Sequence, residues 1–210
     1  MLIHKRISEY YTSKVKEFGC TPFGVDWTCV ATQEMRFVQL LKLCDFSSPL
    51  TINDLGCGYG ALAGFLDRWH GACKVDYLGV DLSEEMVRRA RQLWRGADRV
   101  RFTIGCRSPR MADYSLASGI FNVRLEEPDD CWSSFIRSTL NDLAATSNRG
   151  FAVNFIDRPP SGAWVPQGLY TTSPEPWIEY CSEHIGADVE LVKDYGMREF
   201  TLLARHRPRL

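Results

Sequence analysis

The feature that most constrains this chain is a loop with three glycines, Asp54–Leu55–Gly56–Cys57–Gly58–Tyr59–Gly60. An apolar run over residues 50–55 precedes it and predicts a short strand, and a helical pattern over 61–69 follows it. Glycine lets the backbone turn tightly and lets a ligand approach closely. The free N–H groups at the start of a helix favour electron-rich ligand groups. The loop therefore predicts a nucleotide-like ligand at the edge of a sheet.

The chain around this loop alternates short apolar runs with helical stretches. Further strands are expected at 75–80, 100–104, 114–121, 151–156, 189–192 and 200–204, and further helices at 83–93, 131–145 and 174–185. Such alternation predicts an α/β fold in which a parallel sheet is covered on both faces. The first part of the chain differs, because residues 7–18 and 28–43 both carry apolar side chains at helical spacing. We therefore expect an N-terminal helical cap over 1–48 and one α/β domain over 49–210.

Two carboxylates beside the glycine loop narrow the choice of ligand. Asp81 ends the next expected strand, 25 residues after Gly56, where a carboxylate can accept hydrogen bonds from both ribose hydroxyls. Asp54 lies directly before Leu55–Gly56. It would repel the pyrophosphate of a dinucleotide but attract the ammonium and sulfonium groups of S-adenosylmethionine. The acids favour S-adenosylmethionine, and a nucleotide-binding oxidoreductase stays as the alternative because the glycine spacing alone is weak evidence.

These segments together resemble the class I S-adenosylmethionine-dependent methyltransferases. Residues 53–60 look like the family's first motif, 77–83 like its second, and 112–119 like its fourth strand. The resemblance implies a Rossmann-like sheet of seven strands with helices on both faces and a reversed C-terminal strand. It also implies that the cofactor contacts Asp54, Gly56, Cys57, Gly58, Gly60, Asp81, Leu82 and Ser118. The family often has Gly-Asp after the third strand, whereas this chain has Gly105–Cys106–Arg107. Backbone groups at Cys106 and Arg107 are therefore expected to hold the adenine.

Candidate acceptor residues follow the fourth and fifth expected strands, because ligands in open α/β sheets bind outside the carboxyl ends of the strands. Asn122 and Asp157 are the predicted catalytic residues, with Asp157 as base or orienting group and a turn-forming role as its alternative. Arg36 is expected to pair with the methionine carboxylate or else to be an exposed arginine. The residues expected to contact the substrate are Trp27, Phe121, Arg124, Asn154 and Tyr170. Tyr170 follows a Pro/Gly-containing segment, 158–168, and is expected to gate access.

The composition limits the class of partner. The formal net charge is −1, so no global field draws the chain to nucleic acid or to an anionic membrane. The eight cysteines form no C-x-x-C pair and no zinc spacing, so no metal is expected. No apolar run approaches the roughly 20 residues that span a bilayer. The expectation is a cytoplasmic enzyme that methylates a small molecule at oxygen or nitrogen. A non-catalytic cofactor-binding relative and a protein substrate stay open, and the oligomeric state is not predicted.

Overall fold

The computed structural model of the protein describes residues 2–160, 164 and 166–207. Its seven strands form one sheet in the order β3-β2-β1-β4-β5-β7-β6. The strands are β1 (Leu50–Leu55), β2 (Val75–Asp81), β3 (Val100–Ile104), β4 (Ala112–Ala117), β5 (Ser147–Ile156), β6 (Ala187–Val192) and β7 (Glu199–His206). Neighbouring pairs among β1 to β5 are parallel, whereas β7 runs antiparallel to both β5 and β6. The expected Rossmann-like sheet with a reversed last strand is confirmed.

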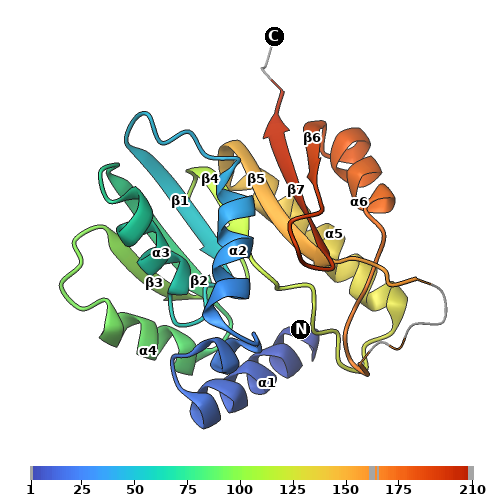
Figure 1. Ribbon diagram of the computed structural model, residues 1–210, viewed down its shortest axis with the longest axis horizontal. Coiled ribbons are helices and arrows are strands. Elements are labelled where there is room, and N and C mark those ends of the chain that lie inside the picture. Colours follow the sequence, from blue (N-terminus) through green and yellow to red (C-terminus); the bar gives the residue numbers. More distant parts are fainter. Residues whose placement is uncertain (1, 161–163, 165, 208–210) are drawn as a thin grey trace.

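Helices cover both faces of this sheet, as the sequence predicted. They are α1 (Leu2–Phe18), α2 (Val30–Leu41), α3 (Ala61–His70), α4 (Glu84–Leu93), α5 (Asp129–Ala145) and α6 (Glu175–Glu179), with a 3-10 turn η1 (Pro22–Val25) and a π turn η2 (Tyr180–His184). In Figure 1, α2 and α3 lie in front of the sheet and α5 lies behind it. Each face has its own apolar core, one filled from α2, α3 and α4 and the other from α5 and α6.

The N-terminal helix α1 lies across the edge where β1 ends (Figure 1). Ile7 of α1 packs into the apolar core on the α5 side of the sheet. Helix α1 also contacts α4, which covers the other side of the sheet. At this edge β1 lies between β2 and β4, so the connection after β1 and the connection leading to β4 run to opposite sides of β1. Open α/β sheets form their ligand crevice at such a point. The boundary at residues 48 and 49 stays a prediction.

The fourth strand is shorter than the sequence predicted. A strand was expected over 114–121, and the prediction of its end was wrong because β4 stops at Ala117. Gly119 has a φ of 73°, and its N–H donates to the Asn154 side-chain oxygen over 2.8 Å. That hydrogen bond turns the chain away from the sheet. The largest further differences are that α1 begins at Leu2 rather than at residue 7, that β5 begins at Ser147 rather than at residue 151, and that the helical pattern at 174–185 divides into α6 and the π turn.

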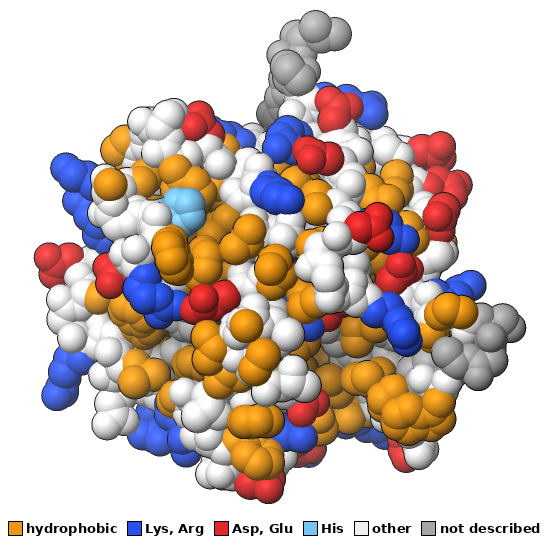
Figure 2. All heavy atoms as spheres, in the orientation of Figure 1, with side chains coloured by type: hydrophobic (Ala, Val, Ile, Leu, Met, Phe, Trp, Pro, Cys, Tyr) orange, Lys and Arg blue, Asp and Glu red, His pale blue; other side chains and the backbone are white. Residues whose placement is uncertain are grey.

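Basic and acidic side chains are mixed over the face shown in Figure 2. Within the described residues, no helix combines the length and the apolar character that crossing a membrane requires. The same residues contain no group of three or more His, Cys, Asp or Glu placed to share a metal ion. Residues 161–163 and 165 of the Pro/Gly-containing segment lie outside the described residues.

Candidate active site

The glycine loop packs directly against the end of β2. The N–H groups of Gly56 and Cys57 both donate to the carbonyl oxygen of Val80, at 2.7 and 3.1 Å. Gly56, Gly58 and Gly60 all have positive φ values, which L side chains adopt only at a cost. A Cβ atom on Gly56 would also fall onto the Ile120 side chain. The loop therefore requires glycine for both its backbone conformation and its close packing.

Asp81 organises the loop from the end of β2. Its carboxyl oxygens accept hydrogen bonds from the N–H of Gly58 and the N–H of Ser83, each over 2.8 Å. Ser83 in turn caps α4 by accepting from the N–H of Met86. Burial raises the pKa of Asp81 above its usual range, against the opposing effect of the backbone donors. One carboxyl group thus links the glycine loop to the start of α4.

Asp54 is buried below the loop with few partners. The hydroxyl of Tyr77 donates to it, and within the described part of the chain no other group donates to this carboxyl. Burial raises the pKa of Asp54 to about 7, the nearby Asp81 charge adds to this, and the Tyr77 hydrogen bond opposes it. A buried carboxylate of this kind is stabilised by a cation. The ammonium and sulfonium groups of S-adenosylmethionine therefore fit the chemistry of this position.

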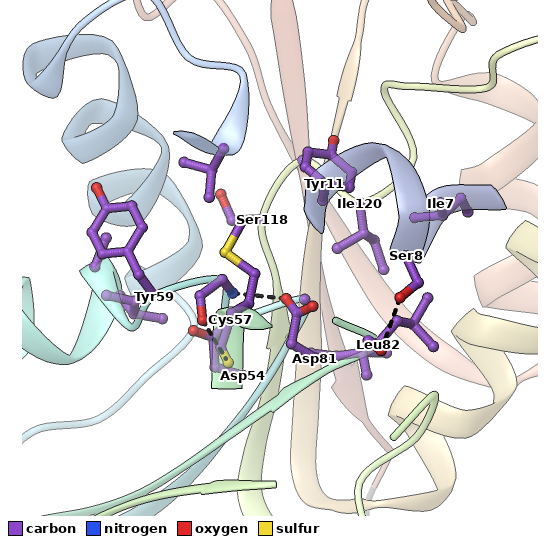
Figure 3. Close-up of a pocket in the computed structure, with 18 of the residues that line it drawn as sticks. Ile7, Ser8, Tyr11, Asp54, Cys57, Tyr59, Asp81, Leu82, Ser118 and Ile120 are labelled. Atoms are coloured by element: carbon purple, nitrogen blue, oxygen red, sulfur yellow. Dashed lines mark hydrogen bonds between the residues drawn. The ribbon is translucent and has the colours of Figure 1, made fainter. Parts of the chain in front are cut away.

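Helix α1 forms the opposite wall of the pocket. Figure 3 shows Ile7, Ser8 and Tyr11 above Asp81 and Leu82, with Asp54, Cys57 and Ser118 beside them. The Ser8 hydroxyl donates to the carbonyl oxygen of Leu82 over 3.1 Å. Thr12 and Ser83 share a further hydrogen bond of 2.6 Å between their hydroxyls. These two contacts hold α1 over the end of β2.

The pocket continues from the glycine loop toward α5. Ile120 and Phe135 line this end, and the His4 ring packs edge-on against Phe135 with 5.6 Å between the ring centroids. Burial lowers the pKa of His4, so its ring is mainly neutral near neutral pH. This end is therefore largely apolar and aromatic, with one neutral imidazole.

The structure brings about half of the sequence-predicted site residues to this one pocket. Those that line it are Trp27, Asp54, Gly56, Cys57, Gly58, Asp81, Leu82, Cys106 and Ser118. Those that do not are Arg36, Gly60, Arg107, Phe121, Asn122, Arg124, Asn154, Asp157 and Tyr170. The first group contains most of the residues expected to hold the cofactor, whereas most of the residues expected to contact the acceptor are absent from the pocket lining.

Several residues of the second group have partners elsewhere. The Arg36 guanidinium donates to both carboxyl oxygens of Glu199 and to the carbonyl oxygen of Thr32. These contacts use three of its five N–H groups. Arg36 is buried, so it is not the exposed arginine of the alternative, and its pairing with the methionine carboxylate stays a prediction. The Asp157 carboxylate pairs with Lys193 over 2.7 Å.

The remaining predicted residues pack around the β4–α5 connection. Phe121 stacks on Phe155 in the core, with ring centroids 5.1 Å apart, and Arg124 pairs with Asp129. The Asn122 backbone carbonyl accepts from the Tyr170 N–H over 2.8 Å. Neither polar atom of the buried Asn122 side chain has a hydrogen-bond partner among the described residues.

Side chains from α1 and α5 also line the pocket, and none of them was among the predicted site residues. They are His4, Ile7, Ser8, Tyr11, Phe135 and Thr139. The helical spacing of Ile7 and Tyr11 identified an amphipathic helix. Which element this helix covers depends on contacts across the chain, such as that between Ser8 and Leu82.

Comparison with known proteins decides the family. A family model described as "Methyltransferase domain" matches residues 52–124, which include the glycine loop and Asp81. A protein of Mycobacterium tuberculosis (strain ATCC 25618 / H37Rv), named "Putative methyltransferase Rv1506c", is 41% identical over 165 residues, covering 79% of this chain and 98% of that protein. The chain belongs to the class I S-adenosylmethionine-dependent methyltransferases. The oxidoreductase alternative is therefore set aside.

Solved structures of other methyltransferases share the fold. Magnesium protoporphyrin IX methyltransferase from Synechocystis PCC 6803, solved with bound S-adenosylhomocysteine, superposes with a TM-score of 0.67 at 16% identity over 97% of this chain and 99% of that one. Human N-acetylserotonin methyltransferase, solved with S-adenosylmethionine, gives a TM-score of 0.63 at 17% identity over 97% of this chain and 56% of that one. At such identities the likeness shows that this methyltransferase shares their fold.

Proposed function

We propose that this methyltransferase acts on a small-molecule acceptor, at an oxygen or a nitrogen atom, by direct in-line displacement. The observation that supports this most is the continuation of the pocket from Asp54 and the glycine loop to the apolar end at Ile120 and Phe135. Helix α1 lies over this end, with Tyr11 on its inner side (Figure 3). A covered apolar pocket suits a small acceptor better than a polymer, which needs an open groove.

The cofactor roles proposed for the pocket follow from its charges. Bound S-adenosylmethionine supplies an electrophilic methyl group on a cationic sulfur. Asp81 would accept hydrogen bonds from the ribose hydroxyls, and Asp54 would hold the methionine ammonium. The backbone of Gly56, Cys57, Gly58 and Gly60 would lie along the methionine portion and Ser118 beside it, while Leu82, Cys106 and Arg107 would surround the adenine.

The residues proposed to bind and orient the acceptor lie mostly around the ends of β4 and β5. Asn122 is proposed to orient the acceptor, because its buried amide group has unused hydrogen-bonding capacity within the described residues. Asp157 is proposed as base or orienting group, a role that requires its release from Lys193. Trp27 would form one wall of the acceptor site, supported by Phe121, Arg124, Asn154 and Tyr170. Most of the rate would come from alignment and exclusion of water.

The names of two structural neighbours are consistent with a small acceptor. One is a magnesium protoporphyrin IX methyltransferase and the other an N-acetylserotonin methyltransferase. Both names specify low-mass acceptors. The shared fold is therefore compatible with the proposed class of substrate.

Methyl transfer from isotopically labelled S-adenosylmethionine tests the proposal. The purified protein is incubated with separate low-mass, protein and RNA fractions of a bacterial extract, each beside a heat-denatured enzyme control. Label in the low-mass fraction alone is the expected result. Label in protein or RNA would contradict a small-molecule acceptor. Binding of S-adenosylmethionine with no labelled fraction would favour the non-catalytic alternative.

A further inference from the structure

A buried carboxyl group, that of Glu199, connects α2 to the turn that follows β4. Glu199 is the first residue of β7, and its side chain is only 5% exposed. One of its carboxyl oxygens accepts from the Arg36 Nε over 2.8 Å and from the Asn154 amide over 3.1 Å. The other oxygen accepts from a terminal nitrogen of Arg36. The carboxylate therefore has a planar two-point contact with α2 and a separate contact with β5.

The first branch of this network runs through Arg36 to the pocket. The Arg36 guanidinium lies over the Trp27 ring, 3.7 Å from the ring centroid. Trp27 lines the pocket, and its ring is in such close contact with Gly119 that a Cβ atom there would overlap it. Cation–π contacts with a desolvated guanidinium orient the ring as well as attract it. Arg36 therefore sets the orientation of the Trp27 ring, which forms part of the pocket wall.

The second branch runs through Asn154 to the same point. The Asn154 side-chain oxygen accepts from the Gly119 N–H over 2.8 Å, while its amide nitrogen donates to Glu199. Ser118 and Ile120, on either side of Gly119, both line the pocket. Asn154 is fully buried, so its amide has one orientation that satisfies both partners. The two branches therefore meet at Gly119, one holding its backbone and the other holding the ring against it.

Stability alone is a weak reason for such a network. A buried ion pair often contributes no more to folding than apolar side chains of the same volume, because both charges must be desolvated. The ends of this network, by contrast, are pocket residues. We propose that Glu199 is a positioning residue that sets the pocket wall formed by Trp27 and residues 118–120. The assignment of this wall to the acceptor site rests on the proposed function.

Substitution of Glu199 by glutamine tests this inference without an acceptor. Glu199→Gln keeps the side-chain shape but removes the charge that holds Arg36. The matched control is Glu190→Gln on β6, whose carboxylate pairs with Arg205 on the exposed surface. The probes are S-adenosylhomocysteine affinity by calorimetry and the 19F NMR spectrum of protein labelled with 5-fluorotryptophan. Trp27→Phe assigns the Trp27 resonance by its disappearance.

The expected result is a shifted or broadened Trp27 resonance in Glu199→Gln, with the resonances of Trp69 and Trp94 unchanged. S-adenosylhomocysteine affinity is expected to fall by about tenfold, which corresponds to about 1.4 kcal/mol. Glu190→Gln is expected to change neither reading. A lower melting temperature with an unchanged Trp27 resonance and unchanged affinity would overturn the inference, because the network would then serve the fold alone.

A second variant covers the case in which Glu199→Gln does not fold. Arg36→Met/Glu199→Leu removes both charges together, which leaves no unpaired buried ion. If Glu199 positions the wall, this variant folds but still shows a displaced Trp27 resonance and weaker binding. Native resonance and native affinity in it would overturn the inference. Failure of the acceptor proposal would appear instead as the absence of labelled low-mass product.

Discussion

The hydroxyl of Tyr77 on β2 lies 2.5 Å from a carboxyl oxygen of Asp54 on β1 and donates a hydrogen bond to it. The two residues are on neighbouring parallel strands, and both are buried beneath the glycine loop. Burial raises the pKa of Asp54 to about 7 and raises the pKa of Tyr77 well above its usual range. The phenol therefore stays protonated as a donor while the carboxyl group changes its charge near neutral pH.

This charge change predicts pH-dependent cofactor binding. The pKa of Asp54 is raised from 3.8 to about 7, so the group is protonated below that value and ionised above it. An ammonium group binds the ionised form, so S-adenosylhomocysteine affinity should fall as the pH drops through about 7. Just below that pH, binding should release a proton, seen by calorimetry as an enthalpy that depends on the buffer's ionisation enthalpy. Equal enthalpies in two such buffers would contradict this, and Asp54→Asn serves as the control without a titrating group.

The same shift predicts that Asp54 lowers the stability of the ligand-free protein. A carboxyl group whose pKa is raised on folding costs stability as the pH rises from 3.8 toward 7, and the full cost is present above 7. Asp54→Asn should therefore raise the melting temperature above pH 7 by roughly 8–16 °C, corresponding to about 4 kcal/mol at about 1.4 kcal/mol per pKa unit. The gain should vanish below the unfolded-state pKa. Thermal unfolding at both pH values checks this, and an equal effect at both would count against it.

Gly119 should be more sensitive to substitution than a glycine of similar conformation. Gly119 has a φ of 73° and Gly96 a φ of 89°, so alanine strains the backbone at both positions, by about 1–2 kcal/mol. Only at Gly119 would the new Cβ meet the Trp27 ring, because nothing lies within 4 Å of such an atom at Gly96. Gly119→Ala should therefore lose more stability than Gly96→Ala and also bind S-adenosylhomocysteine more weakly. Equal losses in both variants, by thermal unfolding and calorimetry, would argue that the contact with Trp27 is unimportant.

The features that could be predicted from the sequence are those determined by residues close together in the chain. The strands 50–55 and 100–104 were predicted to the residue, because short apolar runs between turn residues determine them. The glycine loop and Asp81 followed from a motif that lies within about thirty residues. Strand β4 was predicted too long because its end depends on Asn154, a residue of another strand.

The features that were not predicted depend on contacts between distant residues. Arg36 and Glu199 are 163 positions apart, and no periodicity in either segment links them. The expectation that Arg36 binds the methionine carboxylate used only its place before the cofactor domain. In the same way, the amphipathic pattern of α1 gives its apolar side but not its position over Leu82. Packing of the whole chain decides both.

The hydrogen bond from Ser8 to Leu82 should slow cofactor release. Ser8→Ala removes this contact between α1 and the end of β2, worth about 0.5–1.5 kcal/mol. The dissociation rate of S-adenosylhomocysteine should therefore increase by roughly two- to tenfold in stopped-flow displacement. The control is Ser13→Ala on the same helix, whose hydroxyl donates only to the Tyr10 carbonyl on the exposed side. Faster release in both variants, or in neither, would show that α1 is not held over the ligand by this contact.

The most direct test of the account compares two ligands on two variants. S-adenosylhomocysteine carries the amino acid group that Asp54 is proposed to hold, whereas 5′-methylthioadenosine has the adenosine and thioether without it. Calorimetry should show that Asp54→Asn weakens S-adenosylhomocysteine by about 10- to 100-fold, as expected for a hydrogen bond to a charged group, and leaves 5′-methylthioadenosine unchanged. Asp81→Asn should weaken both ligands alike, because both contain the ribose. An Asp54→Asn variant that weakens both ligands equally, or neither, would contradict the assignment of Asp54 to the methionine ammonium.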